Sequence, residues 1–382
     1  MPMFLSAIDD FSDFVKMKYG KSREKRKFRD PRRKKIYETV HLTDEQIRET
    51  NELFIKNYGK KVPLTWHRHF TAFTGNFDKN YLPELLFIPE LQHFLNFDVD
   101  RYKILADKNF LPLVAKAIGV KMPRTIVCRI RGAYRDADGK KLSYEQVLEK
   151  LTAAGTFFLK PSVDTSSGRG CRLVSLKDGK DAESGDTLEK IIAAAGEDFV
   201  AQERIVCSDE IRALYPYGVN TFRVITYRWK DDIRVLPVIM RIGSGGGHVD
   251  NAHAGGMFIA TDDDGTLHKT AFTEFNKRFD RHPDTDIVFD GYKIGSLPTV
   301  VQTAKRLHEA LPQIGIVNWD FTVDASNEAV LVEANIGGGS IWLPQTAHGK
   351  GAFGEQTPEI LRWIRNMEKL PKHKRVKHTF GK

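Results

Sequence analysis

A chain of 382 residues is long enough for two or three domains, because a compact domain usually takes roughly 100 to 200 residues. Hydrophobic residues make up 41% and charged residues 29% of the sequence, and these ordinary values exclude wholesale disorder and collagen-like repeats. The three cysteines lack a C-x-x-C spacing, which disfavours a disulfide framework and a zinc site and favours buried thiols. No apolar run approaches the roughly 18 to 20 residues that span a bilayer, and the N-terminal segment is acidic, unlike a secretory signal, so we expect a cytoplasmic protein.

The net charge of +9 is concentrated near the two ends of the chain. Residues 16–35 hold twelve Lys and Arg against two acidic residues, and residues 369–382 add six more without an acid. We therefore separate a basic N-terminal arm (1–40) and a basic tail (369–382) from a mildly acidic body. Such arms attract polyanions through nonspecific electrostatics, so a polyanion or an anionic membrane, bound peripherally, is an expected partner. A merely solubilising segment explains the same charge run.

The region after the basic arm, residues 41–98, is predicted to be helical. Thr43 begins a capping-box pattern, and apolar residues follow it at near-helical spacing up to Gly59. Residues 63–97 are rich in aromatic residues and are interrupted by prolines, which indicates short helices and loops without a strand. A further helix is predicted after Asp107, because the apolar residues that follow fall on one helical face until Gly119.

From about residue 120 the pattern changes to short β-branched strands that alternate with helices, which indicates an α/β or α+β fold. The run at 125–130 predicts the first strand. Further strands are predicted at 156–161, 171–176, 198–205, 221–229, 232–241, 256–260, 315–323 and 328–334. Helices are predicted at 143–154, 187–195, 298–311 and 358–368. Glycine clusters beside several predicted strand ends indicate loops that can carry a site.

The first candidate site is a strand that ends at Lys160, a loop of small residues that ends at Gly170, and a returning strand. Small residues let backbone N–H groups close over a polyphosphate, while Lys160 neutralises its charge. The loop is not a Walker motif, because G-K-[ST] is missing and a strand follows where a Walker loop has a helix. A hairpin turn with an exposed lysine is the competing interpretation.

The second candidate site is a pair of strands that carry Asp320 on one and Glu333 and Asn335 on the other. If the two strands are adjacent and antiparallel, these side chains can point to the same face. That face would offer the hard oxygen ligands that Mg²⁺ binds together with water and phosphates. A polar, solvent-facing side of the sheet is the competing interpretation.

Two further sets of residues lie between these sites. The strand at 199–205 can present backbone groups to an adenine edge, with the carboxylate of Glu210 beyond it for a ribose. Arg223 and Arg241 lie on adjacent predicted strands, where a guanidinium can bind a phosphate or the developing charge of a transition state. Ordinary ion pairs on the sheet would explain both arginines as well.

The order of these parts resembles the ATP-grasp superfamily over residues 100 to 345 or so. Stretches such as FLKPSVDTSSGRG, NTFRVITYR, HVDNAHAGG and NWDFTVD are similar to the sugar-transfer-associated ATP-grasp proteins, which are related to α-L-glutamate ligase-like enzymes. The resemblance implies an α+β fold of two subdomains that clasp ATP, here residues 99–200 and 201–368. The helical region before them departs from the Rossmann-like domain with which many members begin.

The resemblance also implies roles for individual residues. Lys108 and Lys160 would contact the ATP phosphates, and Arg241 and Arg223 would act near the transferred phosphate. The mobile loop over the phosphates would comprise Ser166, Ser167, Gly168, Arg169 and Gly170. Gln202, Glu203 and Ile205 would lie at the adenine and Glu210 at the ribose, and two Mg²⁺ ions would be held by Asp320, Glu333 and Asn335. The long glycine loop at 243–256 is predicted to contact the substrate through His248, Asp250, Asn251 and His253. A flexible loop whose histidines face water is the competing interpretation.

The function that the resemblance implies is ATP- and Mg²⁺-dependent ligation of a carboxylate to an amine through an acyl phosphate, in cell-surface polysaccharide biosynthesis. The partners would be a small carboxylate and an amine, such as a uronic acid and an amino acid, or a glycan acceptor. A kinase that phosphorylates a sugar or small molecule is one alternative. A nucleic-acid-binding protein on a nucleotide-binding scaffold is another, but specific nucleic-acid binding is disfavoured because no RNP, zinc-finger or helix-turn-helix pattern is present.

Overall fold

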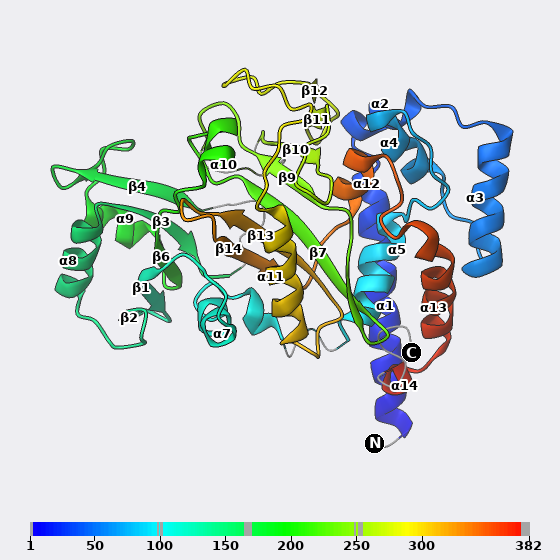
Figure 1. Ribbon diagram of the computed structural model, residues 1–382. Coiled ribbons are helices and arrows are strands. Elements are labelled where there is room, and N and C mark those ends of the chain that lie inside the picture. The colour runs from blue at the N-terminus through cyan, green and yellow to red at the C-terminus, as the bar shows by residue number, and fades with distance from the viewer. Residues whose placement is uncertain are drawn as a thin grey trace.

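The computed structural model describes residues 3–97, 99, 102–163, 170–247, 250 and 255–375, with the side chains of residues 3–7 left aside (Figure 1). Within this part of the chain, two antiparallel sheets stand beside a layer of helices. The α+β class and most of the predicted elements are confirmed. Among the described helices, none combines the length and the hydropathy that crossing a membrane requires.

The helical layer is built from both ends of the chain. The C-terminal helices α12 (Trp342–His348) and α13 (Thr357–Lys369) pack beside the N-terminal ones, so that Phe54, Trp66 and Ile364 belong to one buried cluster. The N-terminal helices are α1 (Met3–Lys27), α2 (Pro31–Glu38), α3 (Asp44–Asn57), α4 (Thr65–Thr74), α5 (Glu84–Leu86), the π-helical turn η1 (Phe87–Gln92) and α6 (His93–Leu95). The capping box predicted at Thr43 is present.

The basic N-terminal segment is helical and packs on the body of the protein. It forms α1 and α2, and α1 buries Met17, Glu24 and Asp13 against the body of the protein. The carboxylate of Asp13 forms an ion pair with Arg375 in α14 (Lys372–Arg375), so the described part of the basic tail is also folded. These contacts could not be predicted from the charge run. The excess of Lys and Arg comes from the solvent-facing residues of the helix and says nothing about its buried residues.

The first sheet has the strand order β2-β1-β6-β3-β4-β5. Its strands are β1 (Thr125–Ile130), β2 (Ala133–Arg135), β3 (Thr156–Pro161), β4 (Arg172–Lys177), β5 (Lys180–Asp181) and β6 (Phe199–Glu203). Helices α8 (Tyr144–Ala154) and α9 (Leu188–Ala194) cover one face and bury Val147, Leu151 and Ile191 against it. On β3, Phe157 and Leu159 face this core, so the intervening Phe158 and Lys160 face the other side of the sheet.

The second sheet has the order β12-β11-β10-β9-β7-β13-β14, and β8 also pairs with β7. Its strands are β7 (Thr221–Trp229), β8 (Asp232–Val235), β9 (Ile239–Ile242), β10 (Met257–Ala260), β11 (Ala271–Phe272), β12 (Arg278–Phe279), β13 (Ile316–Val323) and β14 (Ala329–Asn335). Helix α11 (Leu297–Glu309) packs on one face, where Val317, Trp319 and Phe321 of β13 are buried.

The prediction of a single strand at 232–241 is wrong in one respect. The segment forms two strands, β8 and β9, with a break around Pro237. Proline has no N–H to donate to a ladder, so the pairing stops before it and resumes after it. Both pieces pair with the same edge of β7, β8 with its second half and β9 with its first. This arrangement sets Arg241 of β9 opposite Thr221 of β7.

Candidate active site

A pocket of about 370 Å³ opens between the two sheets. Polar side chains from both sides line it, and β3 and the segment before α7 (Leu111–Ile118) face the strands of the second sheet across it. Its charged lining includes Lys108, Lys160, Glu203, Arg241, Asp320 and Glu333, which the sequence singled out from positions as much as 225 residues apart. Ile205 and Asp250 line the same pocket.

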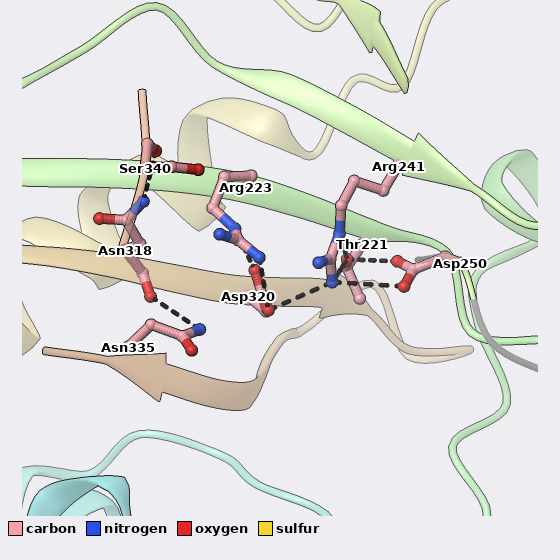
Figure 2. Close-up of polar contacts among 8 residues, drawn as sticks. All are labelled: Thr221, Arg223, Arg241, Asp250, Asn318, Asp320, Asn335 and Ser340. Carbon is pink, nitrogen blue, oxygen red and sulfur yellow. Dashed lines mark hydrogen bonds and ion pairs between the residues drawn. The ribbon is translucent and has the colours of Figure 1, made fainter. Parts of the chain in front are cut away.

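Strand alternation explains why the polar groups of the second sheet gather on one face. Asp320 lies opposite Arg223 of β7 on one side and opposite Glu333 of β14 on the other. Neighbours at i and i+2 share a face, so Thr221 joins Arg223, and Asn318 joins Asp320. Figure 2 shows this row of side chains across β9, β7 and β13.

The carboxylate of Asp320 is shared by two arginines (Figure 2). Arg223 Nε lies 2.6 Å from Oδ1 and its Nη2 lies 3.2 Å from Oδ2, while Nη2 of Arg241 also approaches Oδ2 at 3.2 Å. The side chain of Asp320 is 3% exposed, and those of the arginines 12% and 10%. An ionised carboxylate buried to this degree needs such partners, because removal from water would otherwise cost several kcal/mol.

Asp250 and Thr221 hold Arg241 from its other side. Arg241 donates from Nε and Nη2 to the Thr221 hydroxyl at 3.1 and 2.8 Å, and that hydroxyl donates to Asp250. A second ion pair joins Arg241 Nη2 to Asp250 Oδ1 at 3.3 Å. Burial alone would lower the pKa of Arg241, but the charges of Asp250 and Asp320 outweigh it and raise the pKa, so the guanidinium stays charged.

The two lysines come from β3 and from the turn before α7. Lys160 Nζ donates to Gln202 Oε1 at 3.2 Å, and burial, assisted by the nearby charge of Lys108, lowers its pKa. The backbone N–H of Lys108 bonds to the carbonyl of Ser162 at 3.0 Å, which ties this lysine to the end of β3. Its ammonium lies 3.7 Å from Glu333 Oε1, so the basic group before α7 meets an acidic group of the second sheet.

The remaining predicted residues lie less directly at the pocket. Gln202 is buried and supports Lys160, and Arg223 contacts Asp320 from outside the lining. Glu210 in α10 (Asp209–Leu214) is exposed, and Asn335 donates to the Asn318 carbonyl at 3.4 Å; neither lines the pocket, and nor does Gly170. Outside the described residues lie Ser166, Ser167, Gly168, Arg169, His248, Asn251 and His253.

The pocket has an apolar wall that the sequence reasoning missed. Phe158 and Leu173 line it from the first sheet, and Val332 of β14 and Val219, just before β7, line it from the other side. The alternation of side chains along a strand could have predicted Phe158, because it lies two residues before Lys160 on the same face of β3. Cys171 lies beside them, and burial raises the pKa of its thiol. An apolar wall beside charged side chains suits a ligand that has both an aromatic ring and phosphates.

The family described as sugar-transfer associated ATP-grasp matches residues 90–359, and this range contains every residue of the pocket. The chain belongs to this ATP-grasp family. No curated protein matches the sequence.

Solved ATP-grasp structures provide weaker likenesses. The crystal structure of the VanG D-Ala:D-Ser ligase from Enterococcus faecalis has a TM-score of 0.41 and 14% identity, over 69% of this chain and 62% of that one. The D-alanine–D-alanine ligase from Bacillus anthracis has a TM-score of 0.40 and 15% identity, over 72% and 70%. An L-amino acid ligase from Bacillus licheniformis has a TM-score of 0.37 and 15% identity, over 69% and 48%. The chain thus spans about half to two thirds of the length of most of these structures.

The ATP-grasp family binds a nucleotide together with Mg²⁺, and the donor atoms at β13 and β14 fit such an ion. Asp320 and Glu333 are opposed across the two strands, and Mg²⁺ in nucleotide sites is typically held by one or two carboxylates plus phosphates and water. Among the described residues, no group of three or more His, Cys, Asp or Glu forms a self-sufficient metal cage. The donor set therefore fits a metal that arrives with the nucleotide better than a permanently bound one.

Proposed function

We propose that the protein is an ATP- and Mg²⁺-dependent ligase that joins a carboxylate to an amine. The observation that carries the proposal is one pocket in which two lysines face a carboxylate pair and a buried, permanently charged arginine. Phosphoryl transfer needs such a set, because its catalysis is mostly positioning and offsetting of negative charge.

Each part of the pocket has a role in this reaction. Lys108 and Lys160 would bind the phosphates of ATP, and the apolar wall at Phe158 and Leu173 would take the adenine. Asp320 and Glu333 would hold Mg²⁺, which offsets the charge of the reacting phosphates. Arg241 would orient the γ-phosphate and the substrate carboxylate. The carboxylate oxygen would displace ADP from the γ-phosphorus, and the amine would then displace phosphate from the acyl carbon.

The substrates are proposed from the family description, which associates this ATP-grasp group with sugar transfer. A uronic acid joined to an amino acid, or a similar modification of a cell-surface polysaccharide, would combine a carboxylate and an amine in one product. Asp250, in the glycine loop at 243–256, contacts Arg241 at the pocket. An acceptor bound by this loop would therefore lie beside Arg241.

Hydroxylamine tests the reaction type, since it traps an acyl phosphate as a hydroxamate whichever amine is natural. The wild type would be supplied with Mg-ATP, uronic acids, amino acids and hydroxylamine, and ADP and hydroxamate would be measured. We expect hydroxamate formation that Glu333→Gln abolishes. The matched control is Glu328→Gln, since Glu328 is on the turn of the same hairpin, 61% exposed and paired with Lys121.

Two other results would redirect the assignment. ADP that depends on Glu333 without hydroxamate, together with a phosphorylated sugar, would establish the kinase alternative. Binding of Mg-ATP without ADP formation from any of these substrates would contradict both enzymatic assignments.

A further inference from the structure

Helix α1 has an apolar outer face that nothing in the described structure covers. Its inner face carries Asp13, Met17 and Glu24 and packs on the body. On the outer side lie five large apolar residues that are 47 to 68% exposed: Ile8, Phe11, Phe14, Val15 and Tyr19. Ile8, Phe11, Val15 and Tyr19 follow one another at three- and four-residue intervals, so they form a continuous stripe on the helix. We call these five residues the outer stripe.

Basic side chains flank the C-terminal part of the outer stripe, whereas Asp9 and Asp10 lie beside its N-terminal part. Lys16, Lys18 and Arg26 are exposed on the same helix, and the Lys18 ammonium lies 4.5 Å from the centre of the Phe14 ring. The basic C-terminal segment lies alongside as well, because the backbone N–H of Lys372 bonds to Asp10 Oδ1 at 2.6 Å. Figure 1 shows the N-terminal half of α1 and α14 together at one end of the molecule. The two basic regions of the sequence therefore meet beside one apolar stripe.

The helix is fixed firmly enough to present this stripe as a rigid surface. Arg375 pairs with Asp13, His93 Nε2 lies 2.7 Å from the same carboxylate, and Lys21 pairs with Glu90. Burial opposes ionisation of Asp13, but the hydrogen bonds and charges of His93 and Arg375 prevail and lower its pKa to about 2. These pairs hold the polar inner face on the protein, so the apolar outer face is left exposed.

We propose that the outer stripe and its flanking lysines and arginines dock the protein on an anionic lipid bilayer, with the N-terminal half of α1 in the plane of the membrane interface. Apolar side chains enter the acyl boundary of such a surface while Lys and Arg reach the headgroups. A nucleic-acid duplex would use the charges but not the aromatic and aliphatic stripe. A second copy would use the same apolar stripe, and the oligomeric state of the protein distinguishes that occupant from a membrane.

Vesicle flotation tests the proposal on the full-length protein. We expect binding to vesicles of phosphatidylcholine with phosphatidylglycerol, and much weaker binding to phosphatidylcholine alone. Replacing two ring residues, Phe11→Ser with Tyr19→Ser, should weaken the binding about tenfold or more, because membrane affinity scales with the apolar area inserted. The matched control is Ile55→Ser with Leu113→Ser, since these residues are 46 and 52% exposed on α3 and α7.

Lipid contact can be read directly with a tryptophan in the stripe. Phe14→Trp should be quenched by lipids brominated in the acyl chain, whereas Ile55→Trp on α3 should not. Equal quenching of the two, or none in Phe14→Trp while the protein floats with the vesicles, would show that the stripe does not enter the bilayer. Urea denaturation of each variant would verify that α1 remains folded on the body.

Three results would overturn the proposal. One is unchanged vesicle binding by the Phe11→Ser/Tyr19→Ser variant. Another is binding to duplex DNA or to an anionic polysaccharide that exceeds vesicle binding and is lost in Lys18→Gln with Arg26→Gln but not in the serine variant. The last is a concentration-dependent dimer that the serine variant converts to a monomer, since the stripe would then be a contact between copies.

Discussion

Arg241 of β9 and Asp320 of β13 form a buried ion pair at 3.2 Å although β7 separates their strands. The contact is possible because Thr221, the residue of β7 opposite Arg241, is small, so the guanidinium can pass over it and bond to its hydroxyl on the way. The pair fixes the position of a charged group next to the proposed metal ligands before any substrate binds. Such preorganisation lowers the cost of stabilising charge during the reaction.

The first prediction concerns the loss of this arginine. Arg241→Gln should lower ADP formation by roughly a hundredfold or more, because a fixed charge at the reacting phosphate disappears. It should also lower the free energy of unfolding by about 3 to 5 kcal/mol, because Asp250 and Asp320 stay buried with one partner fewer. Steady-state kinetics and urea denaturation measure the two effects separately.

The matched control for that variant is Arg281→Gln, in an exposed pair with Asp286 at 2.9 Å. Exposed pairs contribute about 0 to 1 kcal/mol, so the control should keep both its stability and its activity. If Arg241→Gln were as stable as the control, the buried network around Asp320 would not exist in the folded protein as described.

A second prediction concerns the loss of Lys160, which should affect stability and ATP binding in opposite directions. Lys160→Met removes a buried ammonium whose pKa burial already lowers, so the variant without nucleotide should be as stable as the wild type or more stable. Its affinity for ATP should fall roughly 10- to 100-fold, the usual worth of a charged hydrogen bond. Calorimetric titration and thermal denaturation measure the two, with Lys177→Met at the exposed end of β4 as control. Unchanged ATP affinity would remove Lys160 from the phosphate site.

Much of the fold follows from local signals in the sequence. The capping boxes at Thr43 and Ser143 and the glycine at 119 mark helix ends directly, because they satisfy groups that every helix end leaves open. The packing of α1 could not be predicted in this way. Its inner face is polar and is held by Glu90 and Arg375, residues far away in the sequence, and such pairing leaves no periodic apolar pattern.

The site was predictable to a similar degree. Adjacent antiparallel strands suffice to bring Asp320 and Glu333 together, and the alternation of β3 puts Phe158 beside Lys160. The sharing of Asp320 by two arginines depends on the order β9-β7-β13, in which strands that are distant in the chain become neighbours. Long-range strand order is set by the packing of the whole domain, so no local motif contains it.

A third prediction uses two glycines in different surroundings. A Cβ at Gly339, after the strand that carries Glu333, would lie 2.5 Å from Asn318 Oδ1, whereas a Cβ at Gly295 meets nothing within 4 Å. Gly339→Ala should therefore cost roughly 1 to 3 kcal/mol of stability and displace Asn318, while Gly295→Ala should be close to neutral. Urea denaturation of both variants makes the comparison. Equal stabilities would mean that the 337–339 loop moves aside at no cost.

The last prediction concerns acid stability and His308, which is buried between α11 and the sheet. Its Nε2–H donates to the Ile314 carbonyl at 2.8 Å, and its Nδ1 accepts from the Thr226 hydroxyl at 2.7 Å, so the ring is neutral. Burial lowers its pKa from 6.5 to about 4. Because the unfolded chain gains a proton first, this group costs no stability above about pH 6.5 and an increasing amount as the pH falls towards 4.

His308→Gln tests this contribution by urea denaturation at two pH values. The variant should be less stable than the wild type near neutral pH, since glutamine fills the site less well. Between about pH 7 and pH 5, however, its free energy of unfolding should fall by roughly 2 kcal/mol less than that of the wild type, because the titrating group is gone. Parallel pH profiles for the two proteins would show that His308 does not titrate below its ordinary range, and the acid sensitivity would then have to come from other groups.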